Sequence, residues 1–282
     1  MKKILLWVRI CRPQTLFASL VPVLVALYVV SLHGDVDTFT GIVTACCALS
    51  LQILSNLIND YYDYVRGTDK AGRAGFKRAL AEGEVSKRAM LVACLTAAGI
   101  ACLLGLYLIY IGTWVILAIG LSALLFAWLY TATSHSLSYL GIADIFVFLY
   151  YGVIASCGTA YLQGATTEVL WQAFFAGGVC GLISMCVLLI NNLRDIADDR
   201  RVGKRTLPVR FGKRFAEGLM LIVICTMPAF AYIAYGLGLE MFIIFPALLL
   251  WIKVLKAKGT EYNKCLLFAG LLNVIYLVLV VL

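Results

Sequence analysis

The sequence predicts an all-α polytopic membrane protein, with about nine transmembrane helices in a pseudo-repeated bundle around a central cavity. Of its 282 residues, 63% are hydrophobic and only 13% are charged, whereas soluble domains carry about 25% charged residues. Charge-free stretches recur at the length of about 20 residues that a spanning helix needs. Hydrocarbon offers no partner to backbone polar groups, so these stretches should be helical. We expect residues 1–282 to form a single integral-membrane domain, because no polar stretch is long enough for a soluble one.

The uncharged runs define nine expected helices. Their predicted ranges are 16–32, 38–59, 89–110, 114–130, 141–162, 169–190, 218–237, 239–255 and 265–282. The uncharged region from 89 to 143 is too long for one span, so we divide it at 111–113. The eighth helix has the shortest uncharged run, and it requires Glu240 and Lys253 to reach the two membrane interfaces.

The distribution of basic residues predicts the orientation. Lys and Arg concentrate in cytoplasmic loops, and a cytoplasmic N-terminus places all 23 Lys and Arg residues in the inner segments. We therefore expect a multi-pass protein of the cell (inner) membrane, with the loops after the second and sixth helices in the cytoplasm. The same rule explains the net charge of +8 without nucleic-acid binding, and it leaves the lipid bilayer as the partner of these charges.

Polar residues gather where the second predicted helix ends. Asn56, Asn59, Asp60 and Asp63 fall within an arc of roughly 100° on a helix, so their oxygens can converge. Asp69 follows shortly after. An Asp at the bilayer centre costs about 2.5–3.5 kcal/mol. These carboxylates should therefore lie at the water-facing mouth of the helix.

A second polar stretch follows the sixth predicted helix. Asn192, Asp195 and Asp199 are spaced i, i+3 and i+7, which places them on one helical face. Clustered carboxylates repel one another unless cations are present. Hard oxygen ligands without His or Cys suit Mg²⁺, which completes its coordination shell with water and phosphate oxygens. The ten cysteines form no CxxC pair, and we interpret them as packing residues.

Basic residues surround both acidic stretches. They are Arg66, Lys70, Arg73, Lys77, Arg78, Arg194, Arg200, Arg201, Lys204, Arg205 and Arg210. Any one of them is explained by the preference of basic residues for the cytoplasmic side. As a set around two metal clusters, they suit a diphosphate whose charge must be neutralised. The rest of such a substrate would be hydrophobic and would lie among the helices.

The paired motifs resemble those of the UbiA superfamily of membrane aromatic prenyltransferases. The matching patterns are Asn59-Asp60-x-x-Asp63 with Gly67-x-Asp69, and Asn192-x-x-Asp195-x-x-x-Asp199 with Gly203-Lys204-Arg205-Thr206. The closer likeness is to the branch that prenylates 1,4-dihydroxy-2-naphthoate in menaquinone synthesis. Supporting stretches are 7–16, 83–86, 139–144, 158–163, 191–195 and 205–212. The chain departs from many relatives at Gly67, where they carry an acid, and in 131–138, where it has His135 but no Lys or Arg.

The resemblance implies Mg²⁺-dependent transfer of a polyprenyl group from polyprenyl diphosphate to 1,4-dihydroxy-2-naphthoate with decarboxylation, giving demethylmenaquinone and diphosphate. One Mg²⁺ would be held by Asn59, Asp60 and Asp63, and the other by Asn192, Asp195 and Asp199. The catalytic residues would be Asp60, Asp63, Asp195 and Asp199. The substrate-binding residues would be Asn56, Arg66, Asp69, Lys70, Arg78, Tyr130, Asp144, Arg194, Lys204 and Arg205.

The remaining candidates have competing explanations. An allylic carbocation needs shielding from water, which aromatic faces near the cavity would provide. The candidates are Tyr61, Tyr62, Tyr130, Phe146, Tyr150 and Tyr151. Asp144 would orient the acceptor or a basic residue, and a charge interaction with its helix N-terminus explains it nearly as well. We interpret Asp198, which points away from the motif face, as a solvated charge.

Two alternatives stay open. A UbiA-type enzyme with another aromatic acceptor, such as 4-hydroxybenzoate or homogentisate, would use the same metal chemistry. A membrane secondary transporter or divalent-cation carrier also uses intramembrane acids and repeated halves. Its acids would lie near the midplane with access from both sides. The motif acids here are instead expected at a single mouth, which favours the enzyme.

Overall fold

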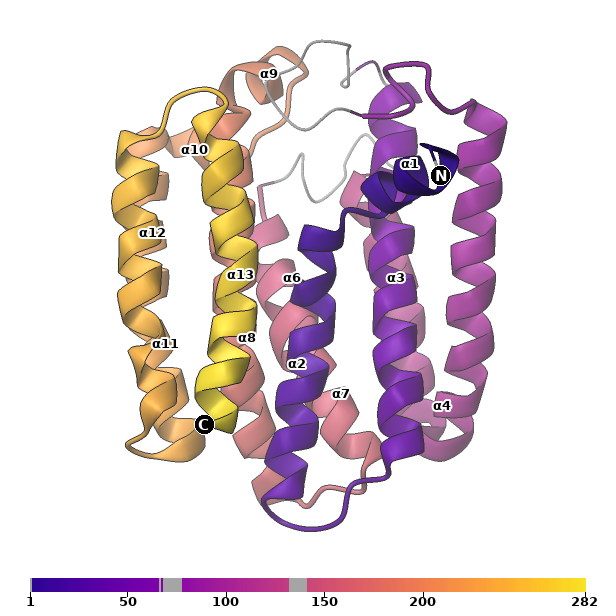
Figure 1. The fold of residues 1–282 in the computed structure, drawn as a ribbon, viewed down its shortest axis with the longest axis vertical. Helices are drawn as coiled ribbons and strands as arrows, with labels where there is room; N and C mark the ends of the chain where they lie inside the picture. The colour runs from indigo at the N-terminus through magenta and orange to yellow at the C-terminus, as the bar shows by residue number, and fades with distance from the viewer. Residues whose placement is uncertain (1, 66, 68–77, 132–140) are drawn as a thin grey trace.

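The computed structural model describes residues 2–65, 67, 78–131 and 141–282, and this part of the chain is all-helical (Figure 1). The longer helices are α2 (Pro13–Ser31), α3 (Thr38–Val65), α4 (Lys87–Thr131), α8 (Thr167–Arg194), α11 (Lys213–Tyr235), α12 (Ile244–Lys256) and α13 (Glu261–Val281). The shorter segments are α1 (Lys2–Cys11), α6 (Ala143–Phe148), the π-helical η1 (Leu149–Ile154), α7 (Ala155–Leu162), α9 (Ile196–Arg201), α10 (Leu207–Phe211) and the 3₁₀ segment η2 (Leu239–Ile243). The predicted fold class is confirmed.

Seven helical stretches in the described part are long and apolar enough to cross a membrane, so the protein is a multi-pass membrane protein. One of them, Lys87–Phe126, contains non-helical backbone at Thr113 (φ 54°, ψ −148°), at the predicted boundary. At 13 residues, α12 is shorter than the seven and continues from η2. The predicted count of nine spans is therefore not confirmed.

Two regions depart from simple helices. The N-terminal α1 was not predicted, and it lies at an angle to the other helices beside the upper part of α3 (Figure 1). The expected fifth helix is divided into α6, η1 and α7. Its π-helical turn packs on α8 through Gly152, where an added Cβ would stand 2.7 Å from the backbone of Gly177 and Gly181. Glycine at this position permits the two backbones to approach closely.

The core is centred on α8. Buried side chains of this helix, including Ile183 and Leu189, pack against α2, α11 and α13. From these neighbours Met220, Ile224 and Leu272 complete the fully buried cluster. The second polar motif therefore emerges from the most deeply packed helix of the bundle.

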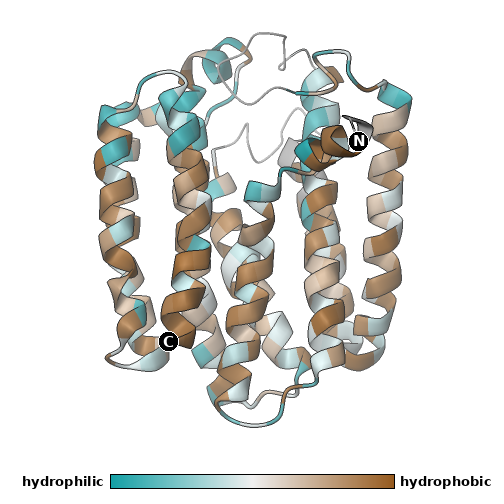
Figure 2. Ribbon diagram, viewed as in Figure 1, coloured by the Kyte–Doolittle hydropathy of each residue, from teal (hydrophilic) through white to brown (hydrophobic). Residues whose placement is uncertain are grey.

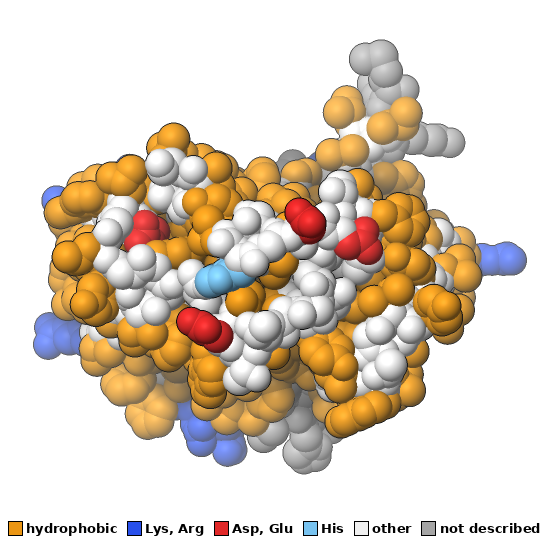
Figure 3. Space-filling model, turned by 90° about the horizontal axis from the view of Figure 1, so that it is seen from below, with side chains coloured by type: hydrophobic (Ala, Val, Ile, Leu, Met, Phe, Trp, Pro, Cys, Tyr) orange, Lys and Arg blue, Asp and Glu red, His pale blue; other side chains and the backbone are white. Residues whose placement is uncertain are grey.

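The two ends of the bundle differ in polarity. Hydrophilic residues concentrate at the end that carries α9 and α10, whereas apolar residues dominate the middle (Figure 2). The opposite end shows isolated acidic side chains among hydrophobic and neutral ones (Figure 3). The C-terminal ends of α3 and α8 both lie at the hydrophilic end (Figure 1). The fold thus delivers both polar motifs to the same side of the membrane.

Candidate active site

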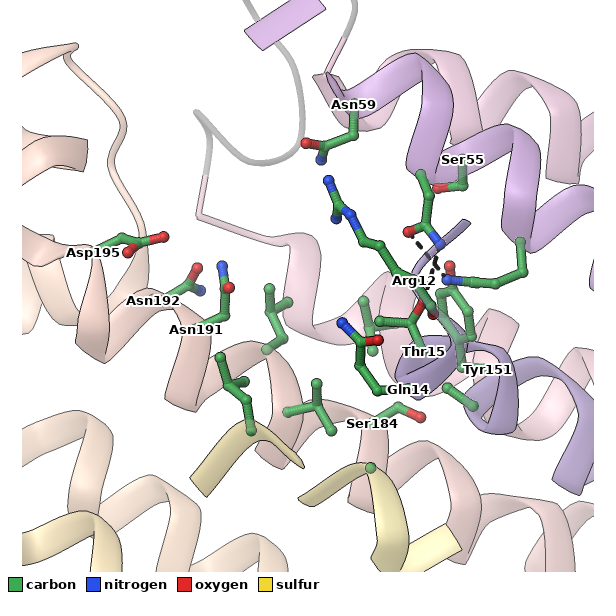
Figure 4. Close-up of a pocket in the computed structure, with 18 of the residues that line it drawn as sticks. Arg12, Gln14, Thr15, Ser55, Asn59, Tyr151, Ser184, Asn191, Asn192 and Asp195 are labelled. Atoms are coloured by element: carbon green, nitrogen blue, oxygen red, sulfur yellow. Dashed lines mark hydrogen bonds between the residues drawn. The ribbon is translucent and has the colours of Figure 1, made fainter. Parts of the chain in front are cut away.

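Both motifs line one cavity of about 230 Å³ at the hydrophilic end of the bundle. The motif residues on its wall are Asn56, Asn59, Asp63, Asn192, Asp195 and Asp199. Asn59 approaches from one side, and Asn192 and Asp195 approach from the other (Figure 4). The two stretches therefore face each other across a shared space, as their pairing predicted.

The first motif is carried by continuous helix. We predicted that the second helix ends at 59, but α3 runs to Val65, because the polar residues extend the same helix beyond the apolar run. Asp60 is buried and pairs with the guanidinium groups of Arg12 and Arg78, the latter at 2.5 Å from Nη1 to Oδ1. Arg12 and Arg78 line the cavity, whereas Asp60 stands behind its wall. The structure thus places this candidate ligand where it positions two cations.

Arg12 was not selected from the sequence as a site residue. Its backbone is in the left-handed region (φ 53°, ψ 70°), between α1 and α2. A non-glycine residue in that region costs roughly 1–3 kcal/mol. The surrounding contacts hold this strained junction in place, because the Nδ2 of Asn56 donates to the carbonyl oxygen of Cys11 (3.1 Å) and to Thr15 Oγ1 (2.9 Å). Asn56 therefore shapes the cavity wall.

The second motif is not on one continuous helix. α8 ends at Arg194, Asp195 has φ −98° and ψ 10°, and α9 begins at Ile196. The helix is therefore interrupted at Asp195, within the motif. Asn192, Asp195 and Asp199 nevertheless all reach the cavity, because the chain continues in the same direction after the break.

Arg194 organises the end of α8. Its Nε and Nη2 donate to the two oxygens of Asp195, both at 2.7 Å. Nη2 also donates to Asn191 Oδ1 (2.8 Å), and Nη1 donates to Asn263 Oδ1 (2.9 Å). The Arg194 side chain is 2% exposed. A buried charge requires such partners, so this predicted substrate contact also builds the site.

Lys204 joins the two motifs. Its Nζ lies 3.6 Å from Asp63 Oδ1 and 3.9 Å from Asp199 Oδ1. It follows a turn at Gly203 (φ 77°), where the Lys204 N–H donates to the carbonyl oxygen of Asp199 (2.9 Å). Carboxylates from α3 and α9 therefore converge on one cation position.

The donor set at this point suits a hard divalent cation. Asn59 Oδ1 is buried without a hydrogen-bond partner among the residues that the structure describes. Asp63, Asn192 and Asp199 add oxygen atoms on the same cavity. Within the described ranges, no three His, Cys, Asp or Glu side chains come together closely enough to hold a metal. Mg²⁺ fits such a site, because it needs only one or two carboxylates besides water and phosphate oxygens.

The structure does not place every predicted site residue on the cavity wall. Arg66, Asp69, Lys70, Arg73 and Lys77 lie outside the described residues, as does the side chain of Tyr130. Arg205 is exposed, and its carbonyl oxygen is close to Gly141, where a Cβ would approach it to 2.3 Å. The Asp198 side chain is 43% exposed and pairs with Arg201 at 3.5 Å, as expected for a solvated charge.

Asp144 occupies an intermediate position at the start of α6. It is buried, and its Oδ1 has no hydrogen-bond partner in the described part of the chain. Val147, one turn later on the same helix, lines the cavity. The carboxyl group therefore belongs to the surroundings of the cavity without lining it.

A second cavity of about 200 Å³ adjoins the first. Its walls are mostly apolar and come from α2, α3, both halves of α4, η1 and α7. Gln52, Ser55, Phe126 and Tyr151 line both cavities. Phe126 stacks on the Tyr150 ring at 4.7 Å between centroids. The polar mouth thus leads into an apolar space through an aromatic junction.

Sequence reasoning missed part of this wall. Besides Arg12, the overlooked lining residues are Gln14, Thr15, Gln52, Ser55, Phe126, Ser184 and Asn273. Gln52, Ser55, Ser184 and Asn273 interrupt apolar spans, and an intramembrane polar residue is itself a signal of function. Nothing in the pattern distinguishes Phe126 from other apolar residues.

Comparisons with known proteins identify the family of the chain. The profile of the UbiA prenyltransferase family matches residues 19–278. The 1,4-dihydroxy-2-naphthoate octaprenyltransferases of Escherichia coli and Mycobacterium tuberculosis are each 34% identical, over 73% and 77% of this chain and 68% and 74% of their own.

Solved structures share the fold. A UbiA homolog from Aeropyrum pernix has a TM-score of 0.71 at 16% identity, covering 95% of this chain and 98% of its own. A UbiA homolog from Archaeoglobus fulgidus, bound to DMAPP and Mg²⁺, has a TM-score of 0.67 at 17% identity, covering 98% and 97%. The family profile spans most of the chain, and the motifs that define the cavity fall within it. The chain therefore belongs to the UbiA prenyltransferase family.

Proposed function

We propose that the protein transfers a polyprenyl group from polyprenyl diphosphate to 1,4-dihydroxy-2-naphthoate, with loss of CO₂ and diphosphate. The product is demethylmenaquinone in its hydroquinone form. The observation that carries the proposal is the convergence of both acidic motifs on Lys204, in a cavity that adjoins an apolar one. The octaprenyltransferases named above support the acceptor, because their similarity extends over most of this chain.

The polar mouth is suited to the diphosphate. Two sets of oxygen ligands would hold Mg²⁺: Asn59 and Asp63 from one side, and Asn192, Asp195 and Asp199 from the other. The bound metal would neutralise charge on the leaving group. Lys204, Arg12 and Arg78 line the same space and would donate hydrogen bonds to diphosphate oxygens. Asp60 would hold Arg12 and Arg78 in place behind the wall. Arg66, Lys70 and Arg205 remain predicted contacts of the diphosphate, and Asp69 remains a predicted substrate-binding residue.

The apolar cavity is suited to the isoprenoid chain. Phe126 and Tyr151 lie at its junction with the polar mouth, and Tyr150 stacks on Phe126. The electron-rich faces of these rings would stabilise a developing allylic cation. The packed helices would keep water from that cation. Tyr130 and Asp144 stay candidates for orienting the acceptor.

The proposed reaction balances without a further reactant. The allylic C–O bond breaks, and its electron pair leaves with diphosphate. A C–C bond forms between the prenyl carbon and the naphthoate ring. The bond between the ring and the carboxylate breaks, its electron pair stays with the ring, and the carboxylate departs as CO₂. The cationic side chains at the mouth would stabilise the departing diphosphate more strongly than the bound ester, because its charge increases.

We propose that the mouth faces the cytoplasm in the cell (inner) membrane. The motifs lie at the hydrophilic end of the bundle (Figure 2), and the basic residues of the sequence favour that side for the cytoplasm. Polyprenyl diphosphate and the naphthoate would both enter from there.

A transfer assay tests the proposed function. The purified protein in lipid nanodiscs is given polyprenyl diphosphate, 1,4-dihydroxy-2-naphthoate and Mg²⁺, and prenylated product, diphosphate and CO₂ are followed. Mg²⁺-dependent formation of all three is expected. Parallel reactions contain 4-hydroxybenzoate or homogentisate instead of the naphthoate. Prenylation of one of these compounds and not of the naphthoate would contradict the proposed acceptor. Metal transport by folded protein without any prenyl transfer would favour the carrier instead.

A further inference from the structure

Asn273 is an unexplained polar residue deep in the bundle. It lies on α13, it is 0% exposed, and it lines the polar cavity. Neither its Nδ2 nor its Oδ1 has a hydrogen-bond partner among the described residues. A buried amide without partners destabilises the folded protein. Its presence on a cavity wall therefore points to a ligand.

Ser184 on α8 has the same properties. It lines the cavity (Figure 4), it is 4% exposed, and its Oγ is without a partner in the described part of the chain. Ser156 on α7 shows the ordinary alternative, because its buried Oγ donates to the carbonyl oxygen of Pro22 at 3.0 Å. A buried serine in this bundle can therefore form a hydrogen bond, and the unpaired hydroxyl of Ser184 is not a consequence of burial alone.

The two residues lie at the far end of the cavity from the motifs. Ser184, Leu188, Asn191 and Asp195 follow one another at helical spacing along the cavity side of α8. Ser184 stands eleven residues before Asp195, or about 16 Å along the helix at 1.5 Å per residue. On α13, Leu266, Gly270 and Asn273 share one face by the same spacing.

This end is separate from the apolar cavity. The residues that line both cavities are Gln52, Ser55, Phe126 and Tyr151 from α3, α4 and η1, whereas α13 contributes to the polar cavity and not to the apolar one. Gly270 brings α13 close to α2, since an added Cβ would lie 2.9 Å from the carbonyl oxygen of Gln14. We call the space lined by Gln14, Ser184, Gly270 and Asn273 the polar branch.

We propose that the polar branch binds the aromatic acceptor, with Asn273 and Ser184 hydrogen-bonding to its ring oxygens. The inference rests on the proposed function and adds the residues that select the acceptor. An amide offers two donors and one acceptor, and a serine hydroxyl offers one donor, which suits a ring with hydroxyl groups. Leu188 and Leu266 provide apolar surface for the ring faces. Arg12, Arg78 and Lys204 line the mouth, so the acceptor carboxylate would face the mouth rather than this branch.

Substitution of the two polar groups tests this assignment. Asn273→Leu retains similar volume and removes the amide, and we expect the KM for 1,4-dihydroxy-2-naphthoate to rise about tenfold. Ser184→Ala should raise it by a smaller factor. The KM for polyprenyl diphosphate should stay unchanged in both. Equilibrium binding of the naphthoate, followed by quenching of tryptophan fluorescence, should weaken in parallel.

Thermal unfolding separates this role from a structural one. Removal of an unpaired buried polar group should leave the unfolding midpoint unchanged or raise it. Ser156→Ala is the matched control, because it removes a paired hydroxyl: its midpoint should fall, while its acceptor KM stays that of the wild type. Unchanged naphthoate binding in folded Asn273→Leu and Ser184→Ala would overturn the inference. Should Asn273→Leu fail to fold, Ser184→Ala and Asn273→Ser decide the question.

The two levels of the proposal fail differently. Wild-type protein that binds polyprenyl diphosphate but neither binds nor prenylates the naphthoate contradicts the proposed function. If the wild type prenylates the naphthoate and Asn273→Leu and Ser184→Ala bind it equally well, only the assignment of the polar branch as the acceptor site is contradicted. Loss of donor binding together with acceptor binding would assign Asn273 to the general shape of the cavity and would also overturn the inference.

Discussion

The two acidic motifs share one residue pattern but are built on different backbones. The first lies within the continuous helix α3, whereas the second crosses a break at Asp195 between α8 and α9. Asp60 pairs with arginines 48 and 18 residues away in the chain, and Asp195 pairs with the adjacent Arg194. The first motif therefore depends on the docking of distant segments, and the second is largely assembled locally.

This difference explains why Lys204 is central to the site. It follows the second motif in the chain but contacts a carboxylate of each motif. One side chain thus couples the locally built wall to the wall that depends on tertiary packing. The Asn and Asp pattern of the sequence determines which oxygen atoms line the cavity. The packing of the helices determines which Arg and Lys side chains pair with them.

The strongest test of the equivalence of the two motifs is removal of one charge from each. We expect Asp63→Asn and Asp199→Asn to lower kcat/KM by about a thousandfold each, as for loss of a major electrostatic contact in a transition state. Prenyl transfer by the variants in nanodiscs measures this loss. Asp198→Asn is the matched control, because this exposed side chain pairs only at the surface with Arg201. A large loss at one motif alone would show that the two sides are unequal in catalysis.

Next in size is the contrast between the arginines. Arg194→Ala leaves Asp195 buried without its bidentate partner, and breaking such a pair destabilises a protein by about 3–5 kcal/mol. Arg12→Ala should destabilise less, because Arg78 still pairs with Asp60. Thermal unfolding midpoints of both variants in one detergent give the comparison. An equal or larger fall for Arg12→Ala would contradict the local character of the second motif.

The sequence predicted the class of fold, the two motifs and their common cavity, because these follow from charge-free runs and from polar residues at helix ends. It did not predict the break at Asp195, since helical spacing continues through it in the pattern. It also missed that Asp60 stands behind the wall, because Arg12 reaches it only after α1 and α2 dock on α3. Long-range packing of this kind leaves no periodic signal.

The overlooked polar residues follow the same rule. Ser184 and Asn273 are single interruptions of apolar helices, and they acquire meaning only when α8 and α13 enclose a common cavity. By contrast, the division of α4 at Thr113 could be predicted, because length alone excludes a single span. Features that depend on helix length or on neighbouring residues could therefore be predicted from the sequence. Features that depend on the packing of distant helices around a cavity could not.

A smaller effect is expected at Lys204. Lys204→Met keeps the unbranched stem of the side chain but removes the ammonium shared by Asp63 and Asp199. We expect the KM for polyprenyl diphosphate to rise about tenfold, corresponding to loss of one charge-assisted hydrogen bond. Steady-state kinetics at saturating acceptor measure it. Arg201→Met removes an exposed cation at the end of α9, three residues before Lys204. It should change this KM little, and an equal effect there would point to general loss of positive charge.

The smallest effect concerns an acid outside both motifs. Asp37 accepts hydrogen bonds from the backbone N–H groups of Phe39 (3.0 Å) and Thr40 (3.2 Å) and from Thr40 Oγ1 (2.5 Å). The Thr40 side-chain bond, followed by the backbone bonds, lowers the pKa of Asp37 from its ordinary 3.8. A lowered pKa means that the charged form stabilises the fold above pH 3.8, and that this contribution is lost as the pH falls through the folded-state pKa.

Asp37→Ala should therefore lower the unfolding midpoint at neutral pH by a few degrees at most, and its difference from the wild type should shrink in acid. Thermal unfolding in detergent between neutral pH and the acid range measures both trends. Prenyl transfer at neutral pH should be unchanged, because Asp37 precedes α3 at the end opposite the motifs. A loss of activity comparable with that of Asp63→Asn would show that acids at the two ends of α3 are coupled, and the separation between structural and functional carboxylates would then fail.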